Sequence, residues 1–212
     1  QRALPGDVDA LRASWTTLLL LDARDPSVSP GLQLNSVGGA LRVQKGLAAG
    51  LLPPSLLDEA RSLTADRLSR HPDGYAPTGV VNRAAIVYAA LRDRAAARRL
   101  LEQEVRTSKT PHYYLSDLAD LAEAEGSRGE ALRLFEQAYA KARGPASRFQ
   151  WGALYVQALL RLAPDEAKRI ETATLAVLAE LDGRDRLYTR SRVRLLRLDA
   201  DLVQHLDDAR QE

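Results

Sequence analysis

The sequence feature that most constrains the fold is a pattern of small and large apolar residues that recurs after 34 positions. Ala131, Phe135 and Ala138 place a small, a large and a small side chain at steps of four and three, which is one face of a helix. The same frame 34 residues earlier holds Ala97 and Leu101. Such a pattern predicts helices that cross closely at the small residues and fill the remaining space with the large one.

Each of these helices follows another helix with matching positions. Ala85 and Tyr88 in one correspond to Ala119 and Ala122 in the next. A period of 34 residues built from two antiparallel helices is the tetratricopeptide spacing, and a third, divergent pair over residues 151–170 follows at a spacing of 36. We therefore expect an all-α protein whose antiparallel helix pairs stack as a tetratricopeptide-like, right-handed α-solenoid. The alternative is a helical bundle without regular repeats.

Glycine and proline divide the rest of the chain into segments with apolar residues at helical spacing, so we expect about ten helices and no strand. The predicted helices outside the repeats span residues 7–22, 34–51, 53–71 and 184–208. The last of them is expected to form the polar terminal cap that stacked repeats need. We expect one continuous domain, with N-terminal helices over 1–75 packed on a stack of repeats and capping helix over 76–212.

Two helix starts carry a serine followed three residues later by an acid. Ser55 precedes Asp58 in this way, and Ser127 precedes Glu130. A serine at such a position accepts a hydrogen bond from a backbone N–H of the first turn. Both pairs therefore predict capping boxes.

Charge and composition exclude several classes of protein. Lys and Arg number 30 against 28 Asp and Glu, so the formal charge is only +2, and we expect no nucleic-acid partner. The absence of Cys excludes thiol catalysis, disulfides and thiolate-held metals within this chain. The longest apolar block, Leu18 to Leu21, is far shorter than the roughly 20 residues that cross a bilayer, so we expect a soluble protein without membrane insertion. Because the chain starts at Gln1 and contains no Met, we interpret it as a processed or excised segment.

No motif in the sequence predicts an active site. The histidines lack the spacing of a zinc site; they are His71, His112 and His205. Asp201 and His205 share one helix face but supply only two ligands, and we interpret them as a solvated pair. Residues 38–46 are rich in glycine but lack the order of a phosphate-binding loop and follow no strand. We expect no metal, no cofactor and no catalytic residue, so that the chain is not an enzyme by itself.

The candidate site is a groove lined by the first helix of each pair. In a tetratricopeptide stack these helices form the concave surface, where polar and aromatic residues bind peptides. The residues that we place in this groove are Asn82, Ile86, Tyr113, Ser116, Asp120, Gln150 and Gln157. The alternative is that they are ordinary, partly exposed helix positions. Phe149 and Trp151, in contrast, are interpreted as core residues.

Three stretches carry a resemblance to a known family: PHYYLSDLA at 111–119, RFQWGALYV at 148–156 and DGRDR at 182–186. They resemble the helical, tetratricopeptide-like C-terminal part of certain bacterial thioredoxin-family proteins, and the likeness covers residues 75–190. In that family a secreted thioredoxin-fold domain with a Cys-x-x-Cys pair precedes the helices. The whole protein is taken to work in periplasmic thiol–disulfide exchange.

The resemblance implies a periplasmic or secreted location and an accessory role. Neither the Cys-x-x-Cys pair nor a βαβ pattern is present here, so no catalytic residue carries over. The implied function is to dock a tethered thioredoxin-fold domain or its substrate protein. The alternative is a free-standing tetratricopeptide-like protein that binds a peptide or acts as a scaffold, with no redox connection. A strand–Cys-x-x-Cys–helix pattern upstream of Gln1 would favour the first, and a signal peptide directly before it the second.

Overall fold

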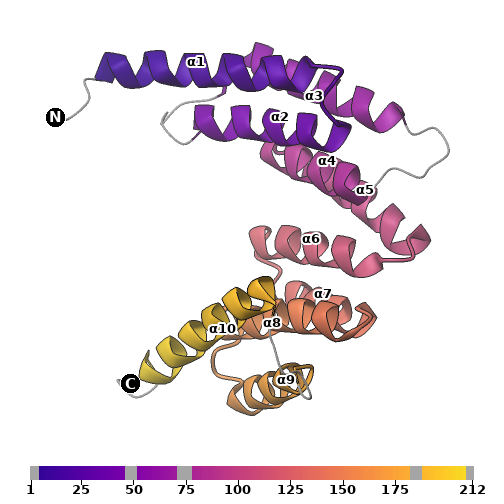
Figure 1. The fold of residues 1–212 in the computed structure, drawn as a ribbon, viewed down its shortest axis with the longest axis vertical. Coiled ribbons are helices and arrows are strands. Elements are labelled where there is room, and N and C mark those ends of the chain that lie inside the picture. The colour runs from indigo at the N-terminus through magenta and orange to yellow at the C-terminus, as the bar shows by residue number, and fades with distance from the viewer. Residues whose placement is uncertain (1–4, 46–51, 71–77, 182–187, 209–212) are drawn as a thin grey trace. The chain divides into compact units, whose positions relative to one another are not determined.

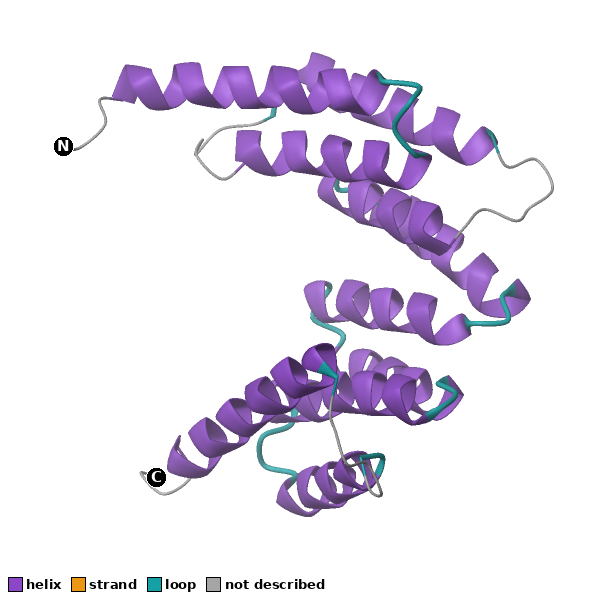
Figure 2. Ribbon diagram, viewed as in Figure 1, coloured by secondary structure: helices purple, strands orange, loops and turns teal. Residues whose placement is uncertain are grey.

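The computed structural model describes residues 5–45, 52–70, 78–181 and 188–208, and these residues form ten helices and no strand (Figure 2). The all-α expectation is confirmed. The helices are α1 (Pro5–Arg24), α2 (Pro30–Lys45), α3 (Pro54–Ser69), α4 (Thr78–Ala90), α5 (Arg94–Thr107), α6 (Pro111–Ala124), α7 (Arg128–Lys141), α8 (Pro145–Leu162), α9 (Ala167–Ala179) and α10 (Thr189–Asp208).

Proline marks the start of several helices. Pro54, Pro111 and Pro145 occupy the first turns of α3, α6 and α8. Proline suits this position because its φ is already helical and its missing N–H would have no partner in the helix. Gly144, directly before α8, has a φ of 78°, which a residue without a Cβ adopts at little cost. The punctuation of the sequence therefore sets these helix starts.

Both predicted capping boxes are wrong. Ser55 lies inside α3, after Pro53 and Pro54, so its backbone is already helical and it cannot be the capping residue. Ser127 does precede α7, but its side chain makes no capping hydrogen bond.

Several predicted boundaries differ from the observed ones. The first helix is longer than expected, since α1 begins at Pro5 and ends at Arg24. The second begins earlier, at Pro30. Some features named from the sequence lie outside the described residues. They are the predicted end of the second helix at residue 51, the predicted start of the last helix at 184, His71, and the stretch 182–186.

The chain divides into two compact units, residues 1–101 and 102–212, and α5 runs across the division. From the sequence we expected one continuous domain and grouped α4 with the repeats of residues 76–212 rather than with the N-terminal helices of residues 1–75. The difference arises because α4 packs with the N-terminal helices. Val80 and Ala84 of α4 form a cluster with Leu34 of α2, and Val87 belongs to a second cluster that includes Leu56 of α3.

In the N-terminal unit, α2 contacts α1, α3 and α4 (Figure 1). Two glycines of α2 face these neighbouring helices at distances that would be ordinary van der Waals contacts for a Cβ. A Cβ on Gly38 would lie 3.9 Å from Val87 of α4, and one on Gly39 would lie 3.4 Å from Leu19 of α1. The glycine-rich stretch therefore belongs to a packed helix as far as Lys45 and not to a loop.

The same unit contains a buried polar network that the sequence did not reveal. Arg67 of α3 is only 4% exposed, and its Nη2 donates a hydrogen bond of 2.9 Å to the carbonyl of Ala23 in α1. Its Nε donates to Oε1 of Gln33 in α2, and its Nη1 pairs with Asp66. The network therefore links α1, α2 and α3 through one side chain.

The longest apolar block lies in α1. Leu19 and Leu20 pack against the core, whereas Leu11, Trp15 and Leu18 are exposed. Among the described helices, none combines the length and apolar content needed to cross a membrane.

In the C-terminal unit, α6 packs on α7, α7 on α8 and α8 on α9, while α10 packs on α8 (Figure 1). The first helices of the successive pairs, α4, α6 and α8, begin at residues 78, 111 and 145, close to the predicted period. The third pair diverges because α8 has 18 residues, which shifts the start of α9 to Ala167. This spacing is compatible with tetratricopeptide-like pairs, and their stacking as a solenoid stays a prediction.

The repeat frame predicts the core of this unit well. Ala131, Phe135 and Ala138 are all buried, and Phe135 is 3% exposed. Phe149 and Trp151 are buried as well, which confirms that they are core residues. Small and large apolar side chains therefore lie where the pattern placed them in α7 and α8.

Candidate functional site

The last helix lies across α8 (Figure 1). Leu198 of α10 is completely buried. Next to this anchor, Nε2 of Gln157 in α8 donates a hydrogen bond of 2.6 Å to Oδ2 of Asp201 in α10. The two helices leave a cavity on either side of this link, and Gln157 lines both.

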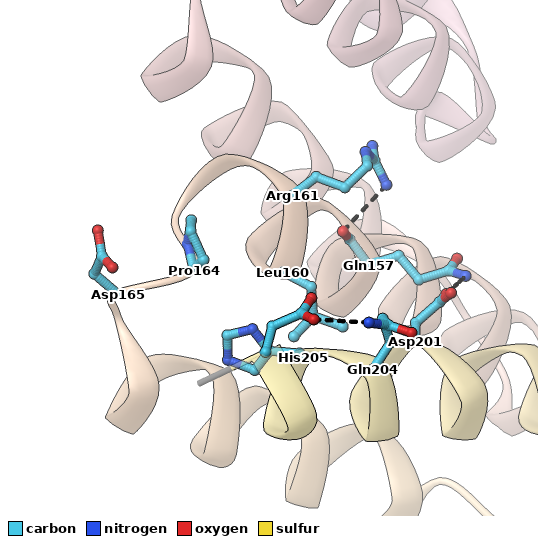
Figure 3. A pocket seen from close by; sticks show the side chains of 9 residues that line it. Gln157, Leu160, Arg161, Pro164, Asp165, Asp201, Gln204 and His205 are labelled. Atoms are coloured by element: carbon cyan, nitrogen blue, oxygen red, sulfur yellow. Dashed lines mark hydrogen bonds between the residues drawn. The ribbon is translucent and has the colours of Figure 1, made fainter. Parts of the chain in front are cut away.

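The first cavity has a volume of about 530 Å³ (Figure 3). Its lining residues are Gln157, Leu160, Arg161, Pro164, Asp165, Asp201, Gln204, His205 and Asp208. Nη1 of Arg161 donates to the Gln157 carbonyl at 3.1 Å, and Gln204 donates to Asp208 at 2.7 Å. Carboxylates predominate here, but no group of three metal-ligating side chains occurs among the described residues.

An acidic cluster on α6 adjoins this cavity through Arg161. The guanidinium of Arg161 binds both carboxylate oxygens of Glu123, at 3.1 and 2.8 Å. Asp120 is exposed to solvent, yet desolvation by the surrounding protein raises its pKa to about 6. The charge of Glu123 raises this pKa by a smaller amount, and the charge of Arg161 acts in the opposite direction. Asp120 therefore changes charge near neutral pH.

The second cavity, of about 520 Å³, has the opposite charge. Its lining residues are Leu154 and Gln157 of α8 and Thr189, Arg190, Val193, Arg194 and Arg197 of α10. Burial, and then the charges of Arg190 and Arg197, lower the pKa of Arg194. The surface between α8 and α10 is therefore positive toward the start of α10 and negative toward its end.

Three aromatic rings meet where α6 and α8 begin. The Trp151 ring centroid lies 5.5 Å from that of His112 and 5.1 Å from that of Tyr113, both edge to face. His112 is buried, its Nδ1 has no hydrogen-bond partner, and desolvation lowers its pKa. Tyr113 is 41% exposed, so this cluster presents one aromatic side chain to a ligand.

The predicted groove residues lie on three helices. Asn82 and Ile86 belong to α4 in the N-terminal unit, Tyr113, Ser116 and Asp120 to α6, and Gln150 and Gln157 to α8. Ser116 is 5% exposed, so its side chain lies beneath the surface. Among these residues, Gln157 is the one that the structure places between the two cavities.

Sequence reasoning missed the contribution of α10, which it treated only as a polar cap. A signal was present, because Arg190, Arg194 and Arg197 recur at steps of four and three and so share one helix face. Asp201 and His205 do lie on one face of α10, and both line the first cavity. Asp201 is not simply solvated, since it accepts the hydrogen bond from Gln157.

The chain was compared with protein-family models, curated proteins and solved structures, and none of the three comparisons found a match. The resemblance to thioredoxin-family proteins therefore stays a prediction from the sequence.

Proposed function

We propose that this chain is a non-catalytic protein-interaction module that binds a peptide segment of its partner between α8 and α10. One observation carries the proposal: α10 lies across α8 and leaves two cavities joined at Gln157. Each cavity has a volume within the roughly 300–1,000 Å³ that is typical of ligand sites. Amide, carboxylate, guanidinium and leucine side chains line them, which suits a peptide backbone with mixed side chains.

The exposed ring of Tyr113 adds an anchor on α6. Its edge-to-face contact with Trp151 holds the ring in place, so binding would cost little conformational entropy. Residues of this kind, rather than exposed charges, supply most of the energy at protein interfaces. Tyr113 and Gln157 are therefore the two groove residues whose substitution by alanine we expect to weaken peptide binding most.

The family resemblance supports a more specific proposal about the partner. We propose that the module docks a tethered thioredoxin-fold domain or its disulfide-bearing substrate in the periplasm of a bacterium. The support is the likeness of residues 111–119 and 148–156, both of which lie in helices of the C-terminal unit. A free-standing peptide-binding or scaffold protein is the alternative, and the sequence encoded upstream of Gln1 distinguishes the two.

Selection from a displayed library of random peptides tests the binding function. Selected peptides should shift backbone NMR signals of α8 and α10, and Tyr113→Ala or Gln157→Ala should weaken binding about tenfold or more. Leu175→Ala is the control, because Leu175 is an exposed apolar residue of α9 that lines neither cavity. Shifts confined to α7 and α9, or no selected peptide at all, would show the proposal to be wrong.

A further inference from the structure

Three arginines of α10 converge on one cavity. Arg190, Arg194 and Arg197 line the cavity of about 520 Å³, opposite Leu154 and Gln157 of α8. Arg192, which lies between them in the sequence, does not line it. The cavity thus gathers three of the four arginines in the first half of the helix.

Within the part of the chain that the structure describes, no carboxylate forms an ion pair with these three side chains. Some other arginines of the same unit are paired. Nε of Arg148 in α8 lies 2.6 Å from Oε1 of Glu180, and Nη2 of Arg161 lies 2.8 Å from Oε2 of Glu123. Among the described residues, the three arginines of α10 therefore share one cavity without the carboxylate partners that Arg148 and Arg161 have.

Such a cluster opposes the stability of its own helix. Like charges three or four residues apart repel one another and destabilise a helix. Positive charge in the first turns of a helix is also unfavourable, because the helix dipole is positive at that end. The pKa of Arg194 responds to this field, since the charges of Arg190 and Arg197 help to lower it. Local arrangements that cost stability are expected at functional sites.

We propose that this cavity binds an acidic peptide segment, whose carboxylates pair with the guanidiniums of Arg190, Arg194 and Arg197. Guanidinium groups bind carboxylates through two parallel hydrogen bonds, which gives the contact direction as well as strength. Leu154 and Val193 offer apolar contacts to the methylene groups of the peptide, and Gln157 can hydrogen-bond its backbone. The inference rests on the proposed function and specifies the chemistry of the bound segment.

The lining residues favour a peptide over a nucleic acid. Single-stranded nucleic acids are bound largely by stacking of bases on aromatic side chains, and none of the residues that line this cavity is aromatic. The cavity is also far larger than a single inorganic anion needs. Acidic side chains on a flexible backbone match both its charge and its volume.

Binding of a fluorescein-labelled peptide of six glutamates to the full 212-residue chain tests the inference by fluorescence anisotropy. A peptide of six glutamines and an oligothymidylate of six nucleotides serve as comparison probes. We expect Arg194→Gln and Arg197→Gln each to weaken glutamate-peptide binding by about tenfold, and added salt to weaken it further. Arg192→Gln is the matched control, since it removes the same charge from the same helix outside the cavity.

The thermal unfolding midpoint separates binding from a structural role. Because the cluster opposes helix stability, Arg194→Gln should leave this midpoint unchanged or raise it, and a lower midpoint would contradict the inference. An equal loss of binding with Arg192→Gln, or tighter binding of the oligothymidylate, would also overturn it. Failure of the glutamate peptide at millimolar concentration, while library-selected peptides still bind, would reject the acidic ligand and leave the proposed function in place.

Discussion

A Cβ added to Gly152 in α8 would lie 2.5 Å from Cγ2 of Val177 in α9. It would also lie 3.1 Å from Cε2 of Tyr139 in α7. Three helices of the C-terminal unit therefore meet at a position where only glycine fits. This close approach explains why a residue that weakens helices stands in the middle of α8.

Gly152→Ala should lower the free energy of unfolding by about 1–3 kcal/mol, because the added methyl group overpacks this junction. Gly129 in α7 is the matched control, since a Cβ there would meet no atom within 4 Å. Gly129→Ala should instead raise the stability by up to about 1 kcal/mol through helix propensity alone. Urea unfolding of both variants checks the prediction, and a stabilising effect of Gly152→Ala would contradict the observed packing.

Phe135→Ala should destabilise the chain by about 3–5 kcal/mol, as expected for truncation of a buried aromatic residue. Phe135 is 3% exposed and lies between Ala131 and Ala138 on the inner face of α7. Urea unfolding measures the effect, and Arg133→Ala on the exposed face of the same helix is the control. A midpoint like that of the wild type would mean that the packing around α7 has been misassigned.

The elements of the fold were largely predictable because they depend on local signals. Proline and glycine mark most helix ends, and the spacing of small and large residues identifies the inner face of α7. The capping boxes failed because a serine and an acid three residues apart do not fix the backbone before a helix. Ser55 shows this directly, since Pro54 had already started α3.

The candidate site was much less predictable, because it depends on contacts between distant segments. Tyr113 is exposed and Gln157 lines both cavities, but the predicted groove residue Ser116 is buried because α6 packs on more than one face. Nothing in the sequence indicated that Leu198 would anchor α10 against α8, or that Asp201 would meet Gln157. The cavities exist only because of that arrangement.

Arg67→Leu should lower the free energy of unfolding by about 2–4 kcal/mol. The reason is that two buried acceptors, on Gln33 and Ala23, lose their hydrogen-bond donor. Each buried acceptor left without a donor costs about 1–3 kcal/mol. Arg70→Leu is the control. Arg70 also pairs with Asp66, at 2.8 Å, but both side chains are exposed, so its loss should cost no more than about 1 kcal/mol. Chemical denaturation of the two variants makes the comparison, and equal effects would show that the buried network contributes nothing beyond an exposed ion pair.

Asp120 should make the stability depend on pH in a direction unusual for a carboxylate. Its pKa in the folded chain is about 6, above the ordinary value of 3.8, so folding disfavours the charged form. The resulting stabilisation is fully present below pH 3.8 and is lost as the pH rises through 6. Since Asp120 reaches solvent, screening should limit the effect to about 1 kcal/mol or less.

Asp120→Asn tests this prediction, because asparagine cannot ionise. Relative to the wild type, the variant should gain stability between pH 4.5 and pH 7.5, since only the wild type acquires the unfavourable charge. Urea unfolding at both pH values measures the difference, and the carboxyl ¹³C signal of Asp120 should titrate near pH 6. Parallel pH dependence of the two proteins, with a carboxyl signal that titrates near pH 4, would mean that solvent stabilises the ionised carboxylate in the folded chain as well as it does in the unfolded one.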